Sequence, residues 1–444
     1  MPPFYAIAAL AIFVVCYALF IFLPRHRSSV ACAAALLVVA LGVVPWREAI
    51  YLVNWNVMGL FIGMLVLADL FMQSKMPAVL AERLVDRMKT VRGAMLAVCA
   101  LAGFLSIFVE NVAVVLLIAP VAFAVADKLN LNPMPFLIAI AVCTNLQGTA
   151  TLIGDPPSML LGGFMKMNFN DFFFYRFPNE IWKQGDTIGA LRPSIFFAVQ
   201  IGAIASMLVL AWLFRRNDQP TATVAVEKIR SWTPTAMLAL LILGLSTCSF
   251  FDPEFKWLAG TMCMVFGAAG VVWYLTVKWG SLKELTQSLD WDTTFFLIGV
   301  FIVVGAIGEV KVSEDNSWLD LLAGALNQYV GTNVLLGFLT MIFLAVAVSG
   351  FVDNVPFLLA MIPVVQKMAD FEHAPLPLFM FGLLIGCSLG GNLTPIGASA
   401  NVVTIGLLRK RGITVSFLDF AKIGVPFTIA AVGASAIFVW LVWR

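Results

Sequence analysis

Two carboxylate–amide pairs stand out in a chain that is otherwise strongly apolar. Glu110-Asn111 and Asp353-Asn354 each separate two apolar stretches, at equivalent places in the two halves of the chain. A carboxylate at membrane depth is costly and is a functional candidate by default. We therefore expect Glu110 and Asp353 to couple transport to a cation, with Na⁺ or a proton bound there and Na⁺ also held at Asn111 and Asn354. The structural alternative is two exposed turns whose polar side chains cap helices.

A second kind of chemistry lies in two interrupted apolar runs, 144–158 and 388–401. Pro156-Pro157 cannot lie inside a continuous helix, and hydrocarbon does not tolerate the freed backbone groups. Broken membrane helices usually line binding sites, with amide ends for anions and carbonyl ends for cations. The alternative is small-residue packing between helices. The candidate ligands are Asn145, Gln147, Gly148, Thr149, Thr151 and Asp155 in the first run and Ser388, Asn392, Thr394, Ser399 and Asn401 in the second.

Composition identifies the class of protein. Of 444 residues, 61% are hydrophobic and 12% charged, whereas soluble domains carry roughly 25% charged residues. The net charge of +2 gives no case for a nucleic-acid partner. The sequence has no HExxH motif, and its only histidines are His26 and His373. We expect an all-α polytopic membrane protein that is not an enzyme, without a cofactor or metal centre. A channel stays open as an alternative to a carrier.

The apolar runs organise into two similar halves. Each half is expected to hold five spans, one of them broken, and a re-entrant hairpin. The first repeat, 1–214, has scaffold spans within 4–73, a hairpin at 94–126 and a broken helix at 135–165. After a cytoplasmic linker at 215–232, the second repeat, 233–444, has scaffold spans within 233–309, a hairpin at 333–369 and a broken helix at 376–407.

Residue matches support this duplication. Gly148 matches Gly391 at an offset of 243, and Gly63 matches Gly299 at an offset of 236. Five crossings per copy invert the second copy relative to the first. With both termini outside the cytoplasm, the cytoplasmic segments hold 18 of the 27 Lys and Arg residues, as the positive-inside rule requires. We expect a multi-pass protein of the plasma (inner) membrane with both termini non-cytoplasmic.

The motifs resemble those of the ion transporter superfamily, in the branch of arsenite permeases, NhaD-type sodium/proton antiporters and pink-eyed-dilution P proteins. The resemblance covers nearly the whole chain. It implies a homodimeric scaffold domain and a transport domain that moves like an elevator, and it leaves room for an energising ATPase subunit. The motifs that carry it are Glu110-Asn111-Val112, the run 148–157, Asp353-Asn354-Val355-Pro356 and the run 390–401.

The acidic hairpin tips bear on the substrate. Related dicarboxylate transporters carry neutral Ser-Asn-Thr tips, whereas both tips here are acidic, and no Lys or Arg lies within either broken run. This favours a cation or a neutral species such as arsenous acid over a free dianion. We expect secondary active transport, with proton-coupled efflux of arsenite or antimonite first. Na⁺/H⁺ antiport and cation-coupled transport of an organic or inorganic anion are the alternatives.

Overall fold

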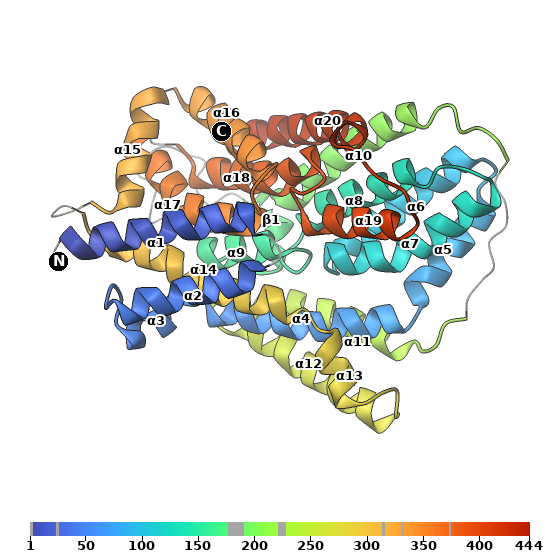
Figure 1. Ribbon diagram of the computed structural model, residues 1–444, viewed down its shortest axis with the longest axis horizontal. Coiled ribbons are helices and arrows are strands. Elements are labelled where there is room, and N and C mark those ends of the chain that lie inside the picture. The colour runs from blue at the N-terminus through green and yellow to red at the C-terminus, as the bar shows by residue number, and fades with distance from the viewer. Residues whose placement is uncertain are drawn as a thin grey trace.

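The chain is almost entirely helical (Figure 1) in the computed structural model, which describes residues 3–23, 26–175, 191–220, 228–312, 316–330, 333–372 and 374–444. Eight of the described helices are long and apolar enough to cross a membrane. The expected all-α polytopic class is confirmed. Parts of the loop 166–192 and of the linker 215–232 lie outside the described residues, as does His373.

The first half begins with four helices, an amphipathic helix and two hairpin arms. They are α1 (Pro3–Phe22), α2 (Arg27–Ala40), α3 (Trp46–Leu52), α4 (Trp55–Gln73), α5 (Met76–Arg87), α6 (Val91–Ser106) and α7 (Asn111–Lys128). The broken helix follows, and a 3₁₀ turn and a strand pair lead to the last helix. These elements are α8 (Met134–Gly148), α9 (Pro156–Met165), η2 (Asn170–Phe172), β1 (Phe174–Tyr175), β2 (Arg192–Pro193) and α10 (Ile195–Leu213).

The second half repeats this order. Its first members are α11 (Thr233–Cys248), α12 (Leu258–Thr276), α13 (Leu282–Ser288), α14 (Trp291–Glu309) and α15 (Trp318–Val330). The hairpin, the second break and the final helix are α16 (Val334–Ser349), α17 (Asn354–Glu372), α18 (Leu376–Gly390), η3 (Gly391–Leu393), α19 (Ser399–Lys410) and α20 (Phe417–Trp443).

The helix bounds recur at the two offsets that the sequence matches indicate. Adding 236 to the bounds of α3 and α4 gives those of α13 and α14, and adding 243 to those of α6 gives those of α16. The start of α9 maps in the same way onto the start of α19. The two halves are therefore two copies of one helix order. The inverted orientation of the second copy stays a prediction.

Several elements differ from expectation. Within the expected scaffold spans of 4–73, the second span is split into α2 and the short α3, because Gly42, at a φ of 69°, and Pro45 interrupt the helix. The matching short helix α13 has no counterpart among the expected spans. It begins with a capping box formed by Ser281 and Glu284. The second hairpin arm, α7, has 18 residues and is itself long enough to cross a membrane.

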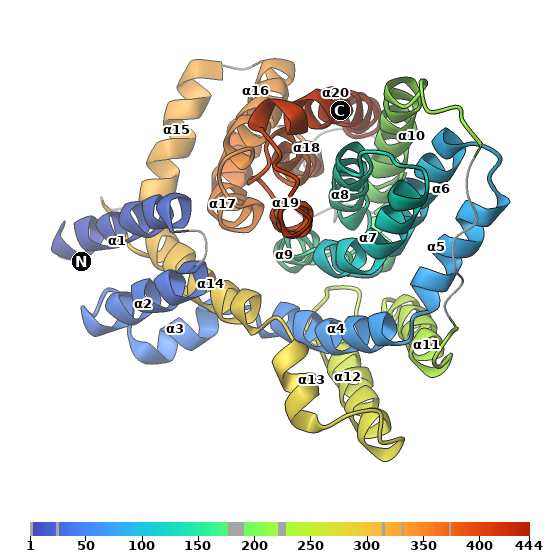
Figure 2. The same cartoon turned by 45° about the vertical axis from the view of Figure 1, so that its right-hand side comes forward.

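The helices form two groups (Figure 2). Helices α6 to α10 and α16 to α20 form one group, and α1 to α4 with α11 to α14 form the other, with α4 and α14 along the boundary. Across that boundary α4 packs on α7 and α9, and α14 packs on α17. We refer to the groups as the transport group and the scaffold group. A cavity of about 640 Å³ lies between them, lined by α3, α4, α9, α14 and α17.

Matched glycines hold the scaffold group together crosswise. Gly63 of α4 lies directly against the backbone of Cys263 in α12, so a Cβ would clash there. Gly299 of α14 lies against α2, where a Cβ would be 2.6 Å from the carbonyl carbon of Ala31. Each copy thus packs its α4-type helix against the second helix of the other copy, backbone to backbone.

Candidate functional site

The first hairpin tip is the turn between α6 and α7. Glu110 precedes the first residue of α7, and its side chain caps no backbone N–H. Within the described part of the chain the Glu110 carboxylate forms no hydrogen bond or ion pair. The neighbouring Asn111 is buried, and its Oδ1 accepts a hydrogen bond of 2.6 Å from Ser106 Oγ. The tip therefore fixes its amide and leaves its carboxylate without a direct partner among the described residues.

The first break separates α8 from α9. Asp155 is the residue before α9; it is buried, and its side chain makes no capping bond. Pro156 and Pro157 occupy the first two positions of α9. Prolines have no N–H to offer, so the positive end of this half-helix presents few donors. An acidic side chain stands where an anion would otherwise bind.

A network of amides joins the two breaks. Asn145 of α8 donates from Nδ2 to Asn392 Oδ1 at 2.8 Å and to Asn401 Oδ1 at 3.1 Å. Its own Oδ1 accepts from Asn111 Nδ2 at 3.3 Å. Asn401 in turn donates to the carbonyls of Gly391 and Thr394, at 2.9 and 3.0 Å. One tip and both breaks are thus linked through Asn145.

The second hairpin tip is held from outside its own group. Arg27, the first residue of α2, places Nη1 2.6 Å from Asp353 Oδ2 and 3.3 Å from Ser399 Oγ. The same guanidinium is 3.2 Å from Asp292 Oδ2 and donates to Thr293 Oγ1 at 2.9 Å, both on α14. The side chains of Arg27 and Asp353 are only 19% and 23% exposed. This ion pair joins the scaffold group to the transport group.

Tips and breaks meet at a cavity of about 30 Å³, which has room for about one or two water molecules. Three carboxylates (Glu110, Asp155 and Asp353) and one cation (Arg27) line it. Seven of the fifteen predicted site residues line the cavity, namely Glu110, Asn111, Asn145, Asp155, Asp353, Asn354 and Ser399.

The other predicted residues support the breaks or lie elsewhere. Gly148 packs against Asn111, and Thr149 bonds back to the carbonyl of Asn145. The hydroxyl of Ser388 is buried, with no hydrogen-bond partner in the described residues. Gln147 faces away and exchanges two hydrogen bonds with Gln200 of α10, at 2.8 and 3.1 Å.

Two pairs of hydroxyl bonds recur at the offset of 243. Ser106 and Ser349 donate to the carbonyls of Thr144 and Cys387, where each hairpin meets its broken helix, and Ser106 shares its one hydroxyl proton between this carbonyl and Asn111 Oδ1. Thr151 and Thr394 donate to the carbonyls of Ile107 and Gly350, where each break meets its hairpin tip. These side-chain bonds give both copies the same local backbone arrangement.

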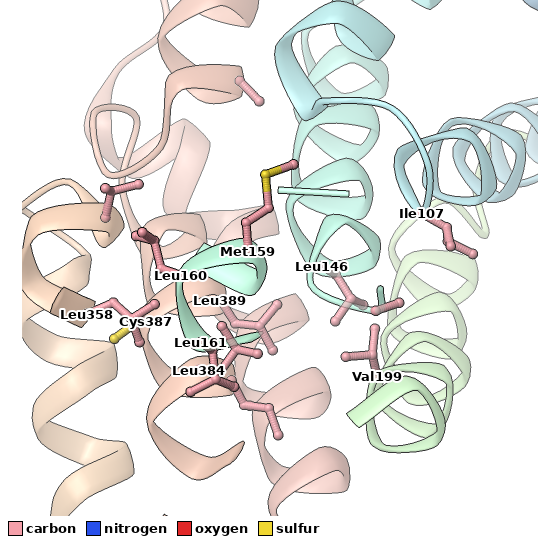
Figure 3. Packing of buried hydrophobic residues seen from close by; sticks show 14 of the residues in the cluster. Ile107, Leu146, Met159, Leu160, Leu161, Val199, Leu358, Leu384, Cys387 and Leu389 are labelled. Carbon is pink, nitrogen blue, oxygen red and sulfur yellow. The ribbon is translucent and has the colours of Figure 1, made fainter. Parts of the chain in front are cut away.

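Apolar packing holds α9, the helix that follows the first break, against α18. Leu160 and Leu161 of α9 lie beside Leu384, Cys387 and Leu389 of α18, and all are buried in the same core (Figure 3). Cys387 is therefore surrounded by aliphatic side chains, which favours a packing role for its thiol.

Arg27, Thr293 and Phe296 are site residues that the sequence reasoning missed. Arg27 follows an apolar run and reads as one of several cytoplasmic charges, yet its guanidinium lies 5.0 Å from the Phe296 ring centroid and reaches the cavity. A signal exists in Asp292 and Thr293, which open α14 at the place matching Asn56 and Val57 of α4. Asp292 stands where the first copy has Asn56, and this additional acid indicates a basic partner.

Comparisons with known proteins show the family to which the chain is related. The profile of a family described as "CitMHS: Citrate transporter" matches residues 17–381. An uncharacterized transporter of Mycobacterium tuberculosis is 29% identical over 450 residues, 98% of each chain. The human P protein is 26% identical over 95% of this chain and 58% of its own length.

Solved structures show the same fold. The YdaH transporter of Alcanivorax borkumensis has a TM-score of 0.59 at 13% identity, covering 87% of this chain and 84% of its own. MtrF of Neisseria gonorrhoeae has a TM-score of 0.56 at 12% identity, covering 92% of this chain and 85% of its own.

Proposed function

The chain belongs to the CitMHS citrate transporter family and is a secondary transporter; from this premise we propose that it couples a cation at its first break to an oxygen-bearing cargo at its second. The observation that carries the proposal is the chemical difference between the two breaks at one cavity. The first break contributes Asp155 and two prolines, and the second contributes Ser399 and an unblocked helix end.

The first break and its tip suit a cation. Glu110 and Asp155 bring two carboxylates to the cavity, and Asn111 brings an amide beside them. Hard cations prefer carboxylate and amide oxygens as ligands. The carboxylate of Glu110 has no other hydrogen bond or ion pair in the described chain to compete for it. Na⁺ or a proton taken up here would be the coupling ion.

The second break suits an oxygen atom that carries negative charge. Helix α19 begins at Ser399, and its first backbone N–H groups have no partner within the helix. The positive end of the helix dipole points the same way. Ser399 Oγ adds a donor, and Ala398, which replaces the acid of the first copy, adds no repulsion. A carboxylate or oxyanion oxygen fits this place.

Citrate is the first cargo to test, because the family is described by it. A cavity of about 30 Å³ does not hold citrate in this conformation. The tips and α14 would therefore have to separate for citrate to enter, as expected if the transport group moves against the scaffold group in an elevator-like cycle. Bound cations would reduce repulsion between a citrate anion and the three carboxylates.

Efflux of arsenite or antimonite is the second candidate. The cation at the site, Arg27, is already paired with Asp353 and Asp292, so the cavity has no spare positive charge to offer an anion. A small neutral oxyacid needs none and occupies less space. Na⁺/H⁺ antiport would be the simplest use of the same carboxylates, with Na⁺ itself as the cargo.

The test is counter-flow in proteoliposomes of the purified protein with labelled citrate, arsenite or Na⁺, under imposed proton and sodium gradients. We expect uptake of one cargo to be driven by a cation gradient. If the flux of every cargo is independent of both gradients, the carrier proposal is wrong and a channel is favoured. Gradient-driven arsenite or Na⁺ flux without citrate flux would select the corresponding alternative.

A further inference from the structure

We infer that Arg27 is the permanent counter-ion of Asp353 and prevents the coupling cation from binding to this carboxylate. The coupling cation then binds at the first tip alone. The inference rests on the proposed function, since it specifies which of two equivalent carboxylates takes the ion. It assigns a specificity-determining role to a residue outside every motif of the repeats.

The guanidinium of Arg27 is held in place by several groups at once. Its Nη1 lies 2.6 Å from Asp353 Oδ2, and its Nη2 donates to Thr293 Oγ1 at 2.9 Å. Asp292 accepts from its Nε, and the Phe296 ring lies 5.0 Å from its guanidinium carbon. Five nearby groups thus hold one guanidinium, counting Ser399 at 3.3 Å. So many contacts fix the charge beside Asp353 in one place.

The first tip has no such partner in the part of the chain that the structure describes. Glu110 corresponds to Asp353 at the offset of 243, and it lines the same cavity, but no basic side chain forms an ion pair with it in the described chain. Asp155 adds a second carboxylate beside it, where the second copy has Ala398. The net negative charge of the cavity is therefore concentrated on the first copy. A cation from solution would gain more there than at an occupied Asp353.

Charge balance gives the consequence for coupling. If Arg27 is removed, Asp353 joins Glu110 and Asp155 as a third cavity carboxylate without an ion pair in the described chain, and leaving it so is strongly unfavourable in a partly buried site. A cation from solution would take the place of the guanidinium. The number of cations moved with each cargo should then rise by one. If Arg27 and Asp353 are neutralised together, the number should return to that of the wild type.

The experiment measures the cation-to-cargo ratio from the reversal potential of the proteoliposome flux. We expect Arg27→Gln to raise the ratio by one cation, whereas Arg27→Lys and the double variant Arg27→Gln/Asp353→Asn keep the wild-type ratio. Arg411→Gln is the matched control, because Arg411 pairs with Asp127 at 2.7 Å within the transport group, between α7 and the end of α19. This control should also keep the wild-type ratio.

An unchanged ratio in a folded, active Arg27→Gln variant would overturn the inference, as would a raised ratio in the double variant. If Arg27→Gln does not fold, Asp353→Asn decides alone. It should keep the wild-type ratio, and a ratio lowered by one would show that Asp353 carries a cation. Absence of cation coupling in the wild-type protein would instead contradict the proposed function, so the two failures are distinguishable.

Discussion

The two hairpin tips have the same backbone and different electrostatics. Ser106 and Ser349, and likewise Thr151 and Thr394, make the same bonds to the same backbone positions in the two copies. Yet the Asp353 carboxylate is paired with Arg27, and that of Glu110 has no ion pair in the described chain. The two halves thus share the shape of the site and differ in its charges. Position within the repeat therefore predicts structure better than it predicts chemistry.

The largest expected effect separates the two tips. Glu110→Gln should weaken binding of the coupling cation by roughly a hundredfold, or about 2.8 kcal/mol, because it removes a carboxylate that has no competing partner among the described residues. Asp353→Asn should retain cation-driven uptake, since Arg27 already neutralises Asp353. The measurement is the cation dependence of uptake in proteoliposomes, with expression and thermal stability as controls. Equal losses in both variants would remove the difference between the tips.

The next effect concerns the centre of the amide network. Asn145→Ala should lower the free energy of unfolding by about 1–3 kcal/mol, because it leaves buried groups of Asn111, Asn392 and Asn401 without their partner. The equivalent position, Ser388, has a buried hydroxyl with no described partner, so Ser388→Ala should be neutral or slightly stabilising. Thermal unfolding in detergent compares the pair. A larger loss for Ser388→Ala would show that its hydroxyl has a role that the contacts do not reveal.

A smaller and symmetric effect is expected at the two threonines. Thr151→Val and Thr394→Val each remove one hydroxyl bond to a tip carbonyl, which in membrane proteins contributes about 0.6 kcal/mol on average. The two losses should be similar, because the bonds are equivalent. Thermal unfolding of each variant, with uptake measured alongside, checks this. Clearly unequal losses of stability would show that the two hydroxyl bonds differ in strength despite their equivalent positions.

The smallest effect lies outside the membrane, at the loop before α12. Burial acts to raise the pKa of Asp252, but hydrogen bonds from the N–H groups of Lys256, Leu258 and Trp257 outweigh it and lower the pKa. The ionised form is thus stabilised by folding. This contribution is present above the ordinary aspartate pKa and is lost as the pH falls through the lowered value.

Asp252→Ala should therefore cost about 1 kcal/mol at neutral pH and less in acid. Cation-coupled uptake should be unchanged, because Asp252 accepts backbone N–H groups at the start of α12 and does not line the cavity at the tips and breaks. Thermal unfolding across a pH series checks the first expectation. A stability difference that stays constant down to strongly acidic pH would contradict the linkage.

Much of the fold follows from the sequence, and less of the site does. The two offsets, 236 and 243, and the proline pair at 156–157 locate the hairpins and the breaks, because backbone constraints act locally. Arg27 and Gln147 show the limit. Both were judged from their neighbours along the chain, but Arg27 meets Asp353 more than three hundred residues away. Gln147 turns towards α10 because its helical position faces Gln200. Contacts between groups of helices cannot be predicted from the local sequence pattern.

The crossed glycines of the scaffold group have a mechanical consequence. Where Gly63 and Gly299 bring backbones into contact, two helices can neither slide nor roll without collision, so this part of the protein behaves as a stiff frame. The boundary with the transport group includes a cavity of about 640 Å³ and gives way more easily. Under load, strain should concentrate at that boundary. A bulky side chain that fills it would act as a wedge and hold the two groups in this arrangement without unfolding either of them.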